Sequence, residues 1–320
     1  MPHIVILATG GTISSQWDAR GAATAVDNAS TLLSTVATPS GVTVEPIDVL
    51  RENSFNFTPH DLRTISEVVR RQLGREDVDG IVITHGTDTV EETAILLELT
   101  HDDRRPVVIT GAQKPSAAPD SDGPQNLRDA IHVASAPASR DRGVMIVFGG
   151  EVLAAYGTRK AHTLIPQPFM NTSGPIGFVT GGSLRYHAYP ERRIPLAPLT
   201  EAFDTTKVDA TLVFPGASVS QLSSESAGLV LVGTGTGNLN REYVNAVRSL
   251  NEQGTVVALS TRVPHGPVAV LYGNGGGGVD AVEAGAIPVT TLPFTQTAVL
   301  LRLLLSSQTV VQTKTLLAQY

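Results

Sequence analysis

Residues 4–13 of this 320-residue chain are Ile-Val-Ile-Leu-Ala-Thr-Gly-Gly-Thr-Ile, an apolar run that ends in a turn rich in threonine and glycine. Residues 81–89 have the same design: Ile-Val-Ile-Thr-His-Gly-Thr-Asp-Thr. Short β-branched runs that end at glycine are typical of buried strands followed by tight turns. In an open parallel α/β sheet, ligands bind in the crevice outside the carboxyl ends of the strands. We therefore expect both turns to face one pocket.

Strand and helix patterns alternate through the first half of the chain. We predict strands near 4–8, 80–84, 106–110 and 143–148, and helices near 59–73, 89–99 and 124–135. This alternation implies parallel strands joined by helical crossovers. Helix 59–73 is defined at both ends, with Thr58 as N-cap, Pro59 in its first turn and Gly74 as terminator.

A stretch rich in proline and in charges of both signs, residues 189–198, divides the chain. We place a linker at 187–209, between an N-terminal catalytic domain at 1–186 and a C-terminal domain at 210–320. The later segment again alternates, with predicted strands near 210–214, 228–232 and 255–259 and helices near 240–251 and 294–307. The predicted fold class is α/β, with a larger, mostly parallel N-terminal αβα domain and a smaller C-terminal α/β domain.

The composition favours a soluble globular protein that acts on a small molecule. Hydrophobic residues make up 41% and charged residues 17% of the chain. A formal charge of −7 and scattered basic residues argue against a nucleic-acid partner. The apolar run 298–305 is too short to span a membrane. Because no basic region followed by an apolar run precedes the first strand, we expect a cytoplasmic location, with an exported mature form as the alternative.

Metals and cofactors are not expected. Neither G-x-G-x-x-G nor G-x-x-x-x-G-K-[ST] occurs, so nucleotide binding by the turn at 9–12 is the weaker interpretation. The eight histidines show no H-E-x-x-H spacing, and a single histidine such as His85 or His132 is more often structural than a ligand. Residues 120–123 resemble the start of a calcium loop, but no glutamate follows at the required distance.

The candidate nucleophiles are hydroxyl groups. The chain has no cysteine, which excludes disulfides and thiolate chemistry, and the G-x-S-x-G turn of serine hydrolases is missing. A threonine hydroxyl is a weak nucleophile unless a base activates it, and Asp88 beside Thr87 adds a fixed negative charge. The chain is therefore predicted to be a hydroxyl-based enzyme.

Taken together, residues 8–13 and 83–89 resemble the two signature segments of bacterial-type L-asparaginases. Further segments extend this resemblance over nearly the whole chain: 110–116, 122–127, 142–144, 235–239 and 262–264. The resemblance implies hydrolysis of L-asparagine through a covalent acyl-enzyme, with release of ammonia. It also implies weaker hydrolysis of glutamine, since one methylene in a pocket is worth only about 1–3 kcal/mol of discrimination.

The resemblance assigns catalytic roles to four residues. Thr12 matches the nucleophile of the family, while Thr87, Asp88 and Lys160 match its proton-handling set. A lysine in a closed pocket is pushed toward its neutral form by desolvation, and it can then accept a proton from a threonine hydroxyl.

The resemblance also assigns substrate contacts. Asp88 would hold the α-ammonium group and Ser54 the α-carboxylate. The carbonyl of Ala112 would contact the side-chain amide. Asn238 matches a residue that the family supplies to the site from a neighbouring subunit.

The glycines of both turns belong to the expected substrate site. We expect the backbone N–H groups of Gly11 and Thr12, and those of the turn that runs from Gly86 through Thr87 to Asp88, to stabilise the oxyanion.

The segment after the first threonine departs from the family pattern. The family has a tyrosine on a lid there, whereas no tyrosine precedes Tyr156 in this chain. Residues 14–31 are polar and aperiodic, and we interpret them as a mobile lid. Phe55 follows Ser54 where the family commonly has a polar residue, so weaker substrate affinity is expected.

A glutamate from the partner subunit often supports the lid tyrosine in the family, and Tyr272 aligns near its position. One hypothesis is that Tyr272 of a neighbouring subunit supplies the missing hydroxyl. The alternative is that this tyrosine only packs against the glycine-rich segment 273–278.

Two other functions compete with an asparaginase. One is a glutaminase-like amidotransferase subunit, whose N-terminal extension is not matched here because the first motif begins within the first ten residues. The other is a non-catalytic amino-acid-binding protein, which would not need Thr12 and Lys160. The family usually forms a tetramer of intimate dimers, so we expect a homotetramer.

Overall fold

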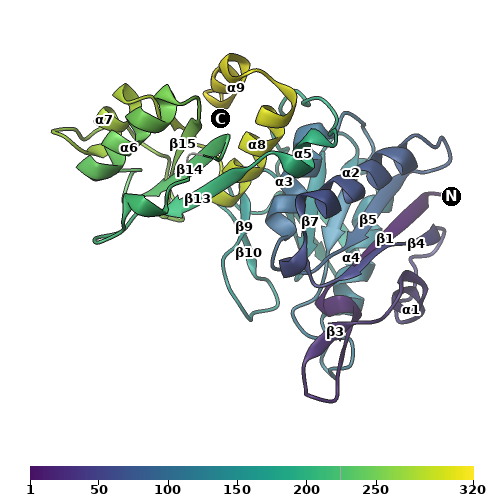
Figure 1. The fold of residues 1–320 in the computed structure, drawn as a ribbon. Helices are drawn as coiled ribbons and strands as arrows, with labels where there is room; N and C mark the ends of the chain where they lie inside the picture. Colours follow the sequence, from purple (N-terminus) through teal and green to yellow (C-terminus); the bar gives the residue numbers. More distant parts are fainter. Residues whose placement is uncertain (224) are drawn as a thin grey trace. The chain divides into compact units, whose positions relative to one another are not determined.

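The computed structural model describes residues 1–223 and 225–320, and it divides into two units, Met1–Leu196 and Ala197–Tyr320 (Figure 1). The division falls inside the proline-rich stretch. Part of that stretch is bound to the first unit, because the Leu196 N–H donates to the Leu99 carbonyl at 2.7 Å.

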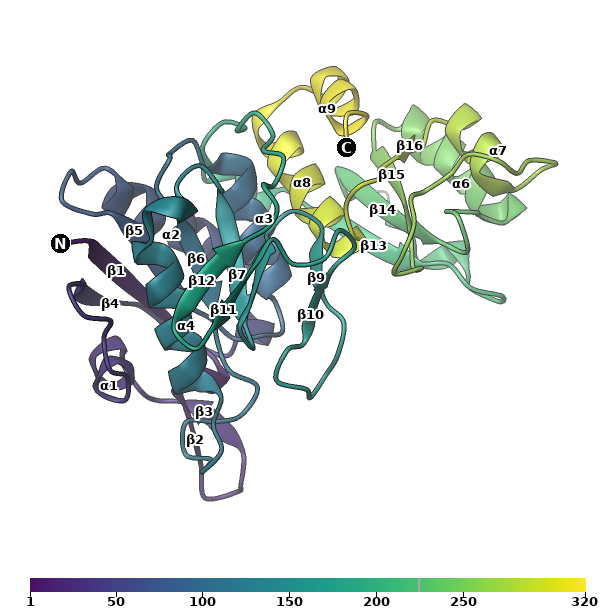
Figure 2. The ribbon, with the colours of Figure 1, turned by 180° about the vertical axis from the view of Figure 1, so that it is seen from behind.

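The first unit is built on an eight-stranded sheet in the order β12-β11-β8-β7-β6-β5-β1-β4 (Figures 1 and 2). Its strands are β1 (His3–Gly10), β4 (Thr43–Glu52), β5 (Gly80–Thr84), β6 (Val107–Thr110), β7 (Val144–Phe148), β8 (Glu151–Ala154), β11 (Gly177–Thr180) and β12 (Ser183–Tyr186). From β4 to β7 all neighbours are parallel, whereas β8, β11 and β12 are added antiparallel. The sheet is thus mostly parallel, as predicted.

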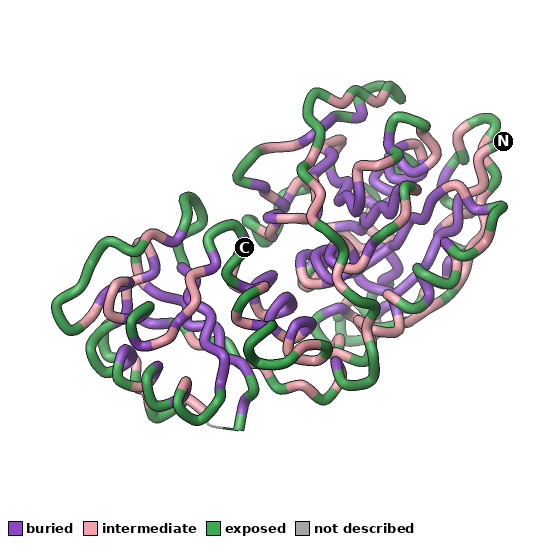
Figure 3. The backbone as a smooth tube through the Cα atoms, turned by 90° about the horizontal axis from the view of Figure 1, so that it is seen from above, coloured by how far each residue is buried: buried purple, intermediate pink, exposed green. Residues whose placement is uncertain are grey.

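Helices cover both faces of this sheet. Val5 and Leu7 of β1 point to a core shared with α2 (Pro59–Leu73) and α3 (Val90–Thr100). Ile4 and Ile6 point to the opposite core, which α1 (Ala29–Ser34) and α4 (Gly123–Ser135) complete. Figure 3 shows the buried backbone concentrated in the strands and on the inner sides of the helices. Because both faces are buried, the central strands are continuously apolar rather than alternating.

Most of these strands and helices were predicted from the sequence. The predicted helix 59–73 is confirmed, and Thr58 forms a capping box with Asp61. The prediction missed β4, which is the edge strand, contains Pro46 and is mostly half-buried or exposed. It also missed the antiparallel strands β8, β11 and β12.

The second unit has a smaller parallel sheet in the order β13-β14-β15-β16. Its elements are α5 (Ala202–Thr205), β13 (Val208–Leu212), β14 (Gly228–Gly233), α6 (Arg241–Glu252), β15 (Val256–Thr261), α7 (Gly277–Glu283), β16 (Ile287–Pro288), α8 (Phe294–Ser307) and α9 (Val310–Leu317). The predicted helix 294–307 is confirmed as α8. The glycine-rich segment 273–278 is not wholly a loop, since its last two residues begin α7.

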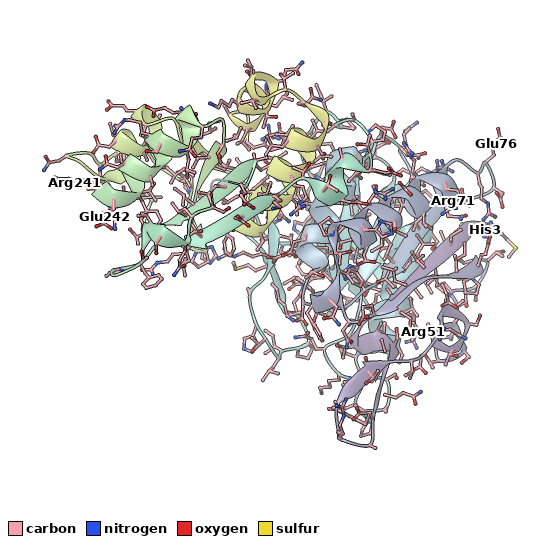
Figure 4. The ribbon with its side chains drawn as sticks, viewed as in Figure 1. His3, Arg51, Arg71, Glu76, Arg241 and Glu242 are labelled. Atoms are coloured by element: carbon pink, nitrogen blue, oxygen red, sulfur yellow. The ribbon has the colours of Figure 1, made fainter. Side chains whose placement is uncertain are left out.

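The amino ends of the first sheet carry a network of charges. His3 lies 3.1 Å from Glu45 and 3.2 Å from Asp77, and Arg75 bonds both carboxylates. Figure 4 labels His3 at this end of the sheet and Arg51 toward the other end. The network ties β1 and β4 to the chain before β5, and it leaves the carboxyl edge to the two turns.

Among the described helices, none combines the length and the apolar character needed to cross a lipid bilayer.

Candidate active site

The turn after β1 lies directly against the turn after β5, and the contact is made by two glycines. A Cβ atom on Gly11 would lie 2.3 Å from the Cα and 2.4 Å from the N atom of Gly86. Gly11 also has a φ of 79°, a conformation that favours glycine. The missing side chains therefore let the residues that follow, Thr12 and Thr87, approach one site.

Ser54 joins the cluster from the other side of Gly86. A Cβ atom on Gly86 would lie 2.6 Å from the Ser54 Oγ. Ser54 is 2% exposed, and its hydroxyl has no hydrogen-bond partner among residues 1–223 and 225–320. A buried hydroxyl without a partner costs free energy that a bound polar ligand can recover. The Ser54 hydroxyl can therefore form a hydrogen bond with a ligand bound in this cluster.

Thr12 is the first residue of the 3-10 turn Thr12–Ser14 and is half-buried. Within the described part of the chain, nothing forms a hydrogen bond with its hydroxyl, and the backbone N–H groups of Thr12, Thr87 and Asp88 also have no partner. These three N–H groups are the donors that the two turns can offer to an oxyanion.

The expected role of the Gly11 N–H needs correction. This group donates to the carbonyl of Glu52 at 3.0 Å, which anchors the turn to the end of β4. It is therefore not free for a substrate. Gly11 supplies space and a left-handed turn instead of a hydrogen bond.

Lys160 connects the residues of the second turn. Its Nζ atom donates to the Thr87 Oγ1 at 2.9 Å and lies 2.7 Å from the Asp88 Oδ1. Thr87 is 5% exposed, whereas the side chain of Asp88 is 53% exposed. A buried hydroxyl, the amino group of a lysine and an accessible carboxylate therefore form one chain of hydrogen-bonding groups.

The acidic residues that follow Asp88 differ in charge. Burial raises the pKa of the Glu92 carboxyl to about 8, and the charges of Glu91 and Asp88 add to this effect. Glu92 is therefore protonated at neutral pH. Asp88, which faces the Lys160 Nζ atom, is the exposed carboxylate that a substrate can reach.

His85 lies behind the second turn as a neutral structural residue. It is fully buried, with Nδ1 2.7 Å from the Gly86 carbonyl and Nε2 2.8 Å from the Thr93 hydroxyl. A carbonyl only accepts, so Nδ1 carries the proton and Nε2 accepts from Thr93. Burial lowers the pKa of His85 to about 4. This imidazole fixes the turn and does not act as a base.

Ala112 follows β6 at the same edge and is fully buried. A Cβ atom on Gly123 would lie 3.4 Å from the Ala112 Cβ and 3.0 Å from the Ile13 Cγ1. Ala112 therefore lies near the residue after Thr12.

The segment expected to be an aperiodic lid contains a β-hairpin instead. Strands β2 (Ser15–Trp17) and β3 (Ala23–Ala25) pair antiparallel. Ser116 binds the base of the hairpin, donating to the Ser15 carbonyl at 2.9 Å and to the Asp27 carboxylate at 2.8 Å. The sequence missed this hairpin because its strands are only three residues long.

Three residues singled out from the sequence take no part in the contacts described so far. Asn238 and Tyr272 belong to the second unit, where the Asn238 Oδ1 accepts from the Gly278 N–H at 3.2 Å and Tyr272 is 58% exposed. Phe55 follows Ser54 but points its ring outward, since it is 65% exposed.

Sequence reasoning also missed Glu91. Its Oε2 atom accepts a hydrogen bond from the backbone N–H of Lys160. The sequence offered one signal for Glu91, its position in the first turn of α3 directly after the second signature segment.

Comparisons with known proteins cover both halves of the chain. A family model described as "Asparaginase, N-terminal" matches residues 3–192, and one described as "Glutaminase/Asparaginase C-terminal domain" matches residues 207–315. The chain is 33% identical to a probable L-asparaginase of Deinococcus radiodurans, over 96% of this chain and 94% of the relative.

Two further relatives match over 96% of the chain and 89% of their own length. L-asparaginase 2 of Escherichia coli is 32% identical, and a probable periplasmic L-asparaginase of Haemophilus influenzae is 31% identical.

The contact between the turns predicts a large effect of Gly11→Ala. Overpacking against Gly86 costs about 1–3 kcal/mol, and the left-handed backbone costs roughly 1–2 kcal/mol more. Gly174→Ala is the matched control, because its φ is 78° and nothing lies within 4 Å of the added Cβ. Urea unfolding should show a larger loss for Gly11→Ala. Equal losses would mean that the close approach of the turns does not matter.

Neutral His85 predicts a loss of stability in acid. The unfolded chain protonates this residue below about pH 6.5, but the folded protein does so only below about pH 4. The free energy of unfolding therefore falls as pH drops through this window, by roughly 3 kcal/mol for this residue. Unfolding of the wild type and His85→Asn at pH 7 and pH 5 checks this. The wild type should lose more, and parallel losses would contradict the assignment.

Proposed function

The chain belongs to the bacterial-type asparaginase family and is an L-asparaginase, and on that premise we propose that it hydrolyses L-asparagine through an acyl-enzyme on Thr12. The observation that carries this proposal is the pairing of two turns. One presents a hydroxyl with no partner in the described chain, and the other presents Thr87 and Asp88 bound to Lys160.

In the first half-reaction, the Thr12 oxygen attacks the carbon of the side-chain amide, and its proton passes through Thr87 to the neutral amine of Lys160. The negative oxygen of the tetrahedral intermediate accepts hydrogen bonds from the N–H groups of the two turns. The carbon–nitrogen bond then breaks, and the leaving nitrogen takes up the proton held by Lys160 and departs as ammonia. An aspartyl ester of Thr12 remains.

In the second half-reaction, water attacks this ester. Lys160 and Thr87 accept a proton from the water, the ester bond breaks, and the proton returns to the Thr12 oxygen. The products are L-aspartate and the free enzyme. The same proton-handling set thus serves both steps.

The substrate is held by its amino-acid end. The exposed Asp88 carboxylate pairs with the α-ammonium group, and the unpartnered Ser54 hydroxyl donates to the α-carboxylate. The carbonyl of Ala112 accepts from the side-chain amide. Gly11 and Gly86 let the two turns and Ser54 pack closely together beside the substrate.

Several features remain part of the proposal. L-glutamine is a weaker substrate, in keeping with the wording of the C-terminal family model. The protein forms a homotetramer in which Asn238 completes the site of a neighbouring subunit. Residues 1–186 form the catalytic domain, and 187–209 link it to the C-terminal domain at 210–320. A cytoplasmic location stays a prediction, since one relative is named a periplasmic protein.

Thr12→Ala is expected to lower kcat for asparagine by several orders of magnitude, because no other group attacks the amide. Thr12→Ser is the control, since it keeps the attacking oxygen and should keep most of the activity. Initial rates of ammonia release measure both. Full activity of Thr12→Ala would overturn the assignment, and an inactive wild type would favour an amino-acid-binding protein.

Tyr272→Phe tests whether a second subunit supplies the hydroxyl that the hairpin after Thr12 lacks. We expect kcat to fall by roughly 100-fold, the lower end of the range for loss of a group that assists proton transfer. The exposed Tyr189→Phe is the control. If both variants turn over asparagine at the wild-type rate, Tyr272 has no catalytic role.

A further inference from the structure

Lys160 is held at both of its ends by one short segment of chain. Its Nζ atom contacts Thr87 and Asp88, and its backbone N–H donates to the Glu91 Oε2 at 2.5 Å. Residues 87–91 therefore hold both the backbone and the Nζ atom of Lys160. Four rotatable carbon–carbon bonds lie between these two points. The hydrogen bond between Glu91 and the Lys160 N–H does not involve the reacting groups. Its effect on the reaction is therefore to place the lysine.

The strand that carries Lys160 needs such a tie because it is not part of the main sheet. Among the described strands, β9 (Thr158–Lys160) pairs only with β10 (Phe169–Asn171), in a separate two-stranded ribbon. A ribbon of two strands is marginal by itself and depends on what it packs against. Phe169 packs β10 against Phe148 of the main core, and the bond to Glu91 fixes the backbone of Lys160 in addition.

Among the described residues, polar bonds hold both ends of β9. At the start of β9, the Asn171 amide donates to the Thr158 Oγ1 at 2.9 Å and to the Tyr156 carbonyl at 2.8 Å. These bonds stay within the ribbon and the residues before it. The bond from Lys160 to Glu91 instead joins the ribbon to α3, the helix that follows the second turn.

Glu91 suits this task because its carboxyl group is buried next to β9. It is 8% exposed and lies in the first turn of α3, where the helix dipole favours a negative charge. The guanidinium of Arg159 is close enough for the Glu91 charge to raise its pKa against the lowering effect of burial. Hydrogen bonds to an ionised carboxylate are stronger than those between neutral groups.

We propose that Glu91 is a positioning residue of the reaction, which fixes the backbone of Lys160 so that Nζ stays within hydrogen-bond distance of Thr87. This inference rests on the proposed function of Lys160 in proton transfer. Glu91 does not touch the substrate in this account. It acts only through the lysine.

The test compares Glu91→Ala and Glu91→Gln with a control on the same helix. Glu98 is also buried, and its Oε2 accepts from the backbone N–H of Val144 at 2.7 Å, which ties α3 to β7 away from the turns. Glu98→Ala therefore removes the same kind of bond without touching the ribbon. Steady-state rates of ammonia release from asparagine and thermal unfolding are measured for all variants.

A displacement of about 1 Å can cost roughly 100-fold in rate, so we expect Glu91→Ala to lower kcat by roughly 10- to 100-fold with a much smaller change in KM. Glu91→Gln keeps an acceptor oxygen and should restore most of kcat. Glu98→Ala should lower the unfolding temperature but leave kcat within about twofold of wild type. An unchanged kcat in Glu91→Ala, no rescue by glutamine, or an equal kcat loss in Glu98→Ala would overturn the proposal.

A double-mutant cycle with Lys160→Met separates this inference from the proposed function. If Glu91 acts through Lys160, Glu91→Ala should cause no further loss of kcat once the lysine is gone. An equal further loss would show that Glu91 acts independently. If Lys160→Met itself kept full activity, the proposed role of Lys160 would fail, and the role of Glu91 with it.

Discussion

The close approach of Gly11 and Gly86 is the constraint on which the site depends. A single methyl group at Gly11 would overlap the backbone of the other turn, so the two hydroxyl-bearing turns can share one site only while both positions lack side chains. Ser54 packs against the far side of Gly86 and extends the same contact to the end of β4. Contacts between backbone atoms therefore fix the positions of the two turns relative to each other.

The fold makes this contact possible at low cost. β1 and β5 are parallel neighbours in register, with Ala8 opposite Thr84, so both strands end at the same level of the sheet. The buried side chains on both faces of the sheet hold the strands in place. The turns are held in place because they follow these strands directly. Lys160 is different, since it comes from a two-stranded ribbon outside the main sheet and needs its own ties to the second turn.

Local patterns predict the parts of this arrangement that depend on local chemistry. Two strands are predicted by the apolar runs at 4–8 and 80–84, and α2 is predicted by its capping residues. The two threonine turns follow from strand ends that share one edge. Lys160 carries no such signal, and its role came only from resemblance to a family. Glu91 and the occupied N–H of Gly11 depend on contacts between residues far apart in sequence, and β4 depends on its place at the sheet edge.

The central claim is that the two turns have separate chemical tasks, with Thr12 as the attacking group and Thr87 as a proton carrier. Rapid acid quenching during turnover of saturating asparagine, followed by peptide mass analysis, tests this most directly. We expect an aspartyl ester on the peptide that contains Thr12 and none on the peptide that contains Thr87. An ester on Thr87 would contradict it.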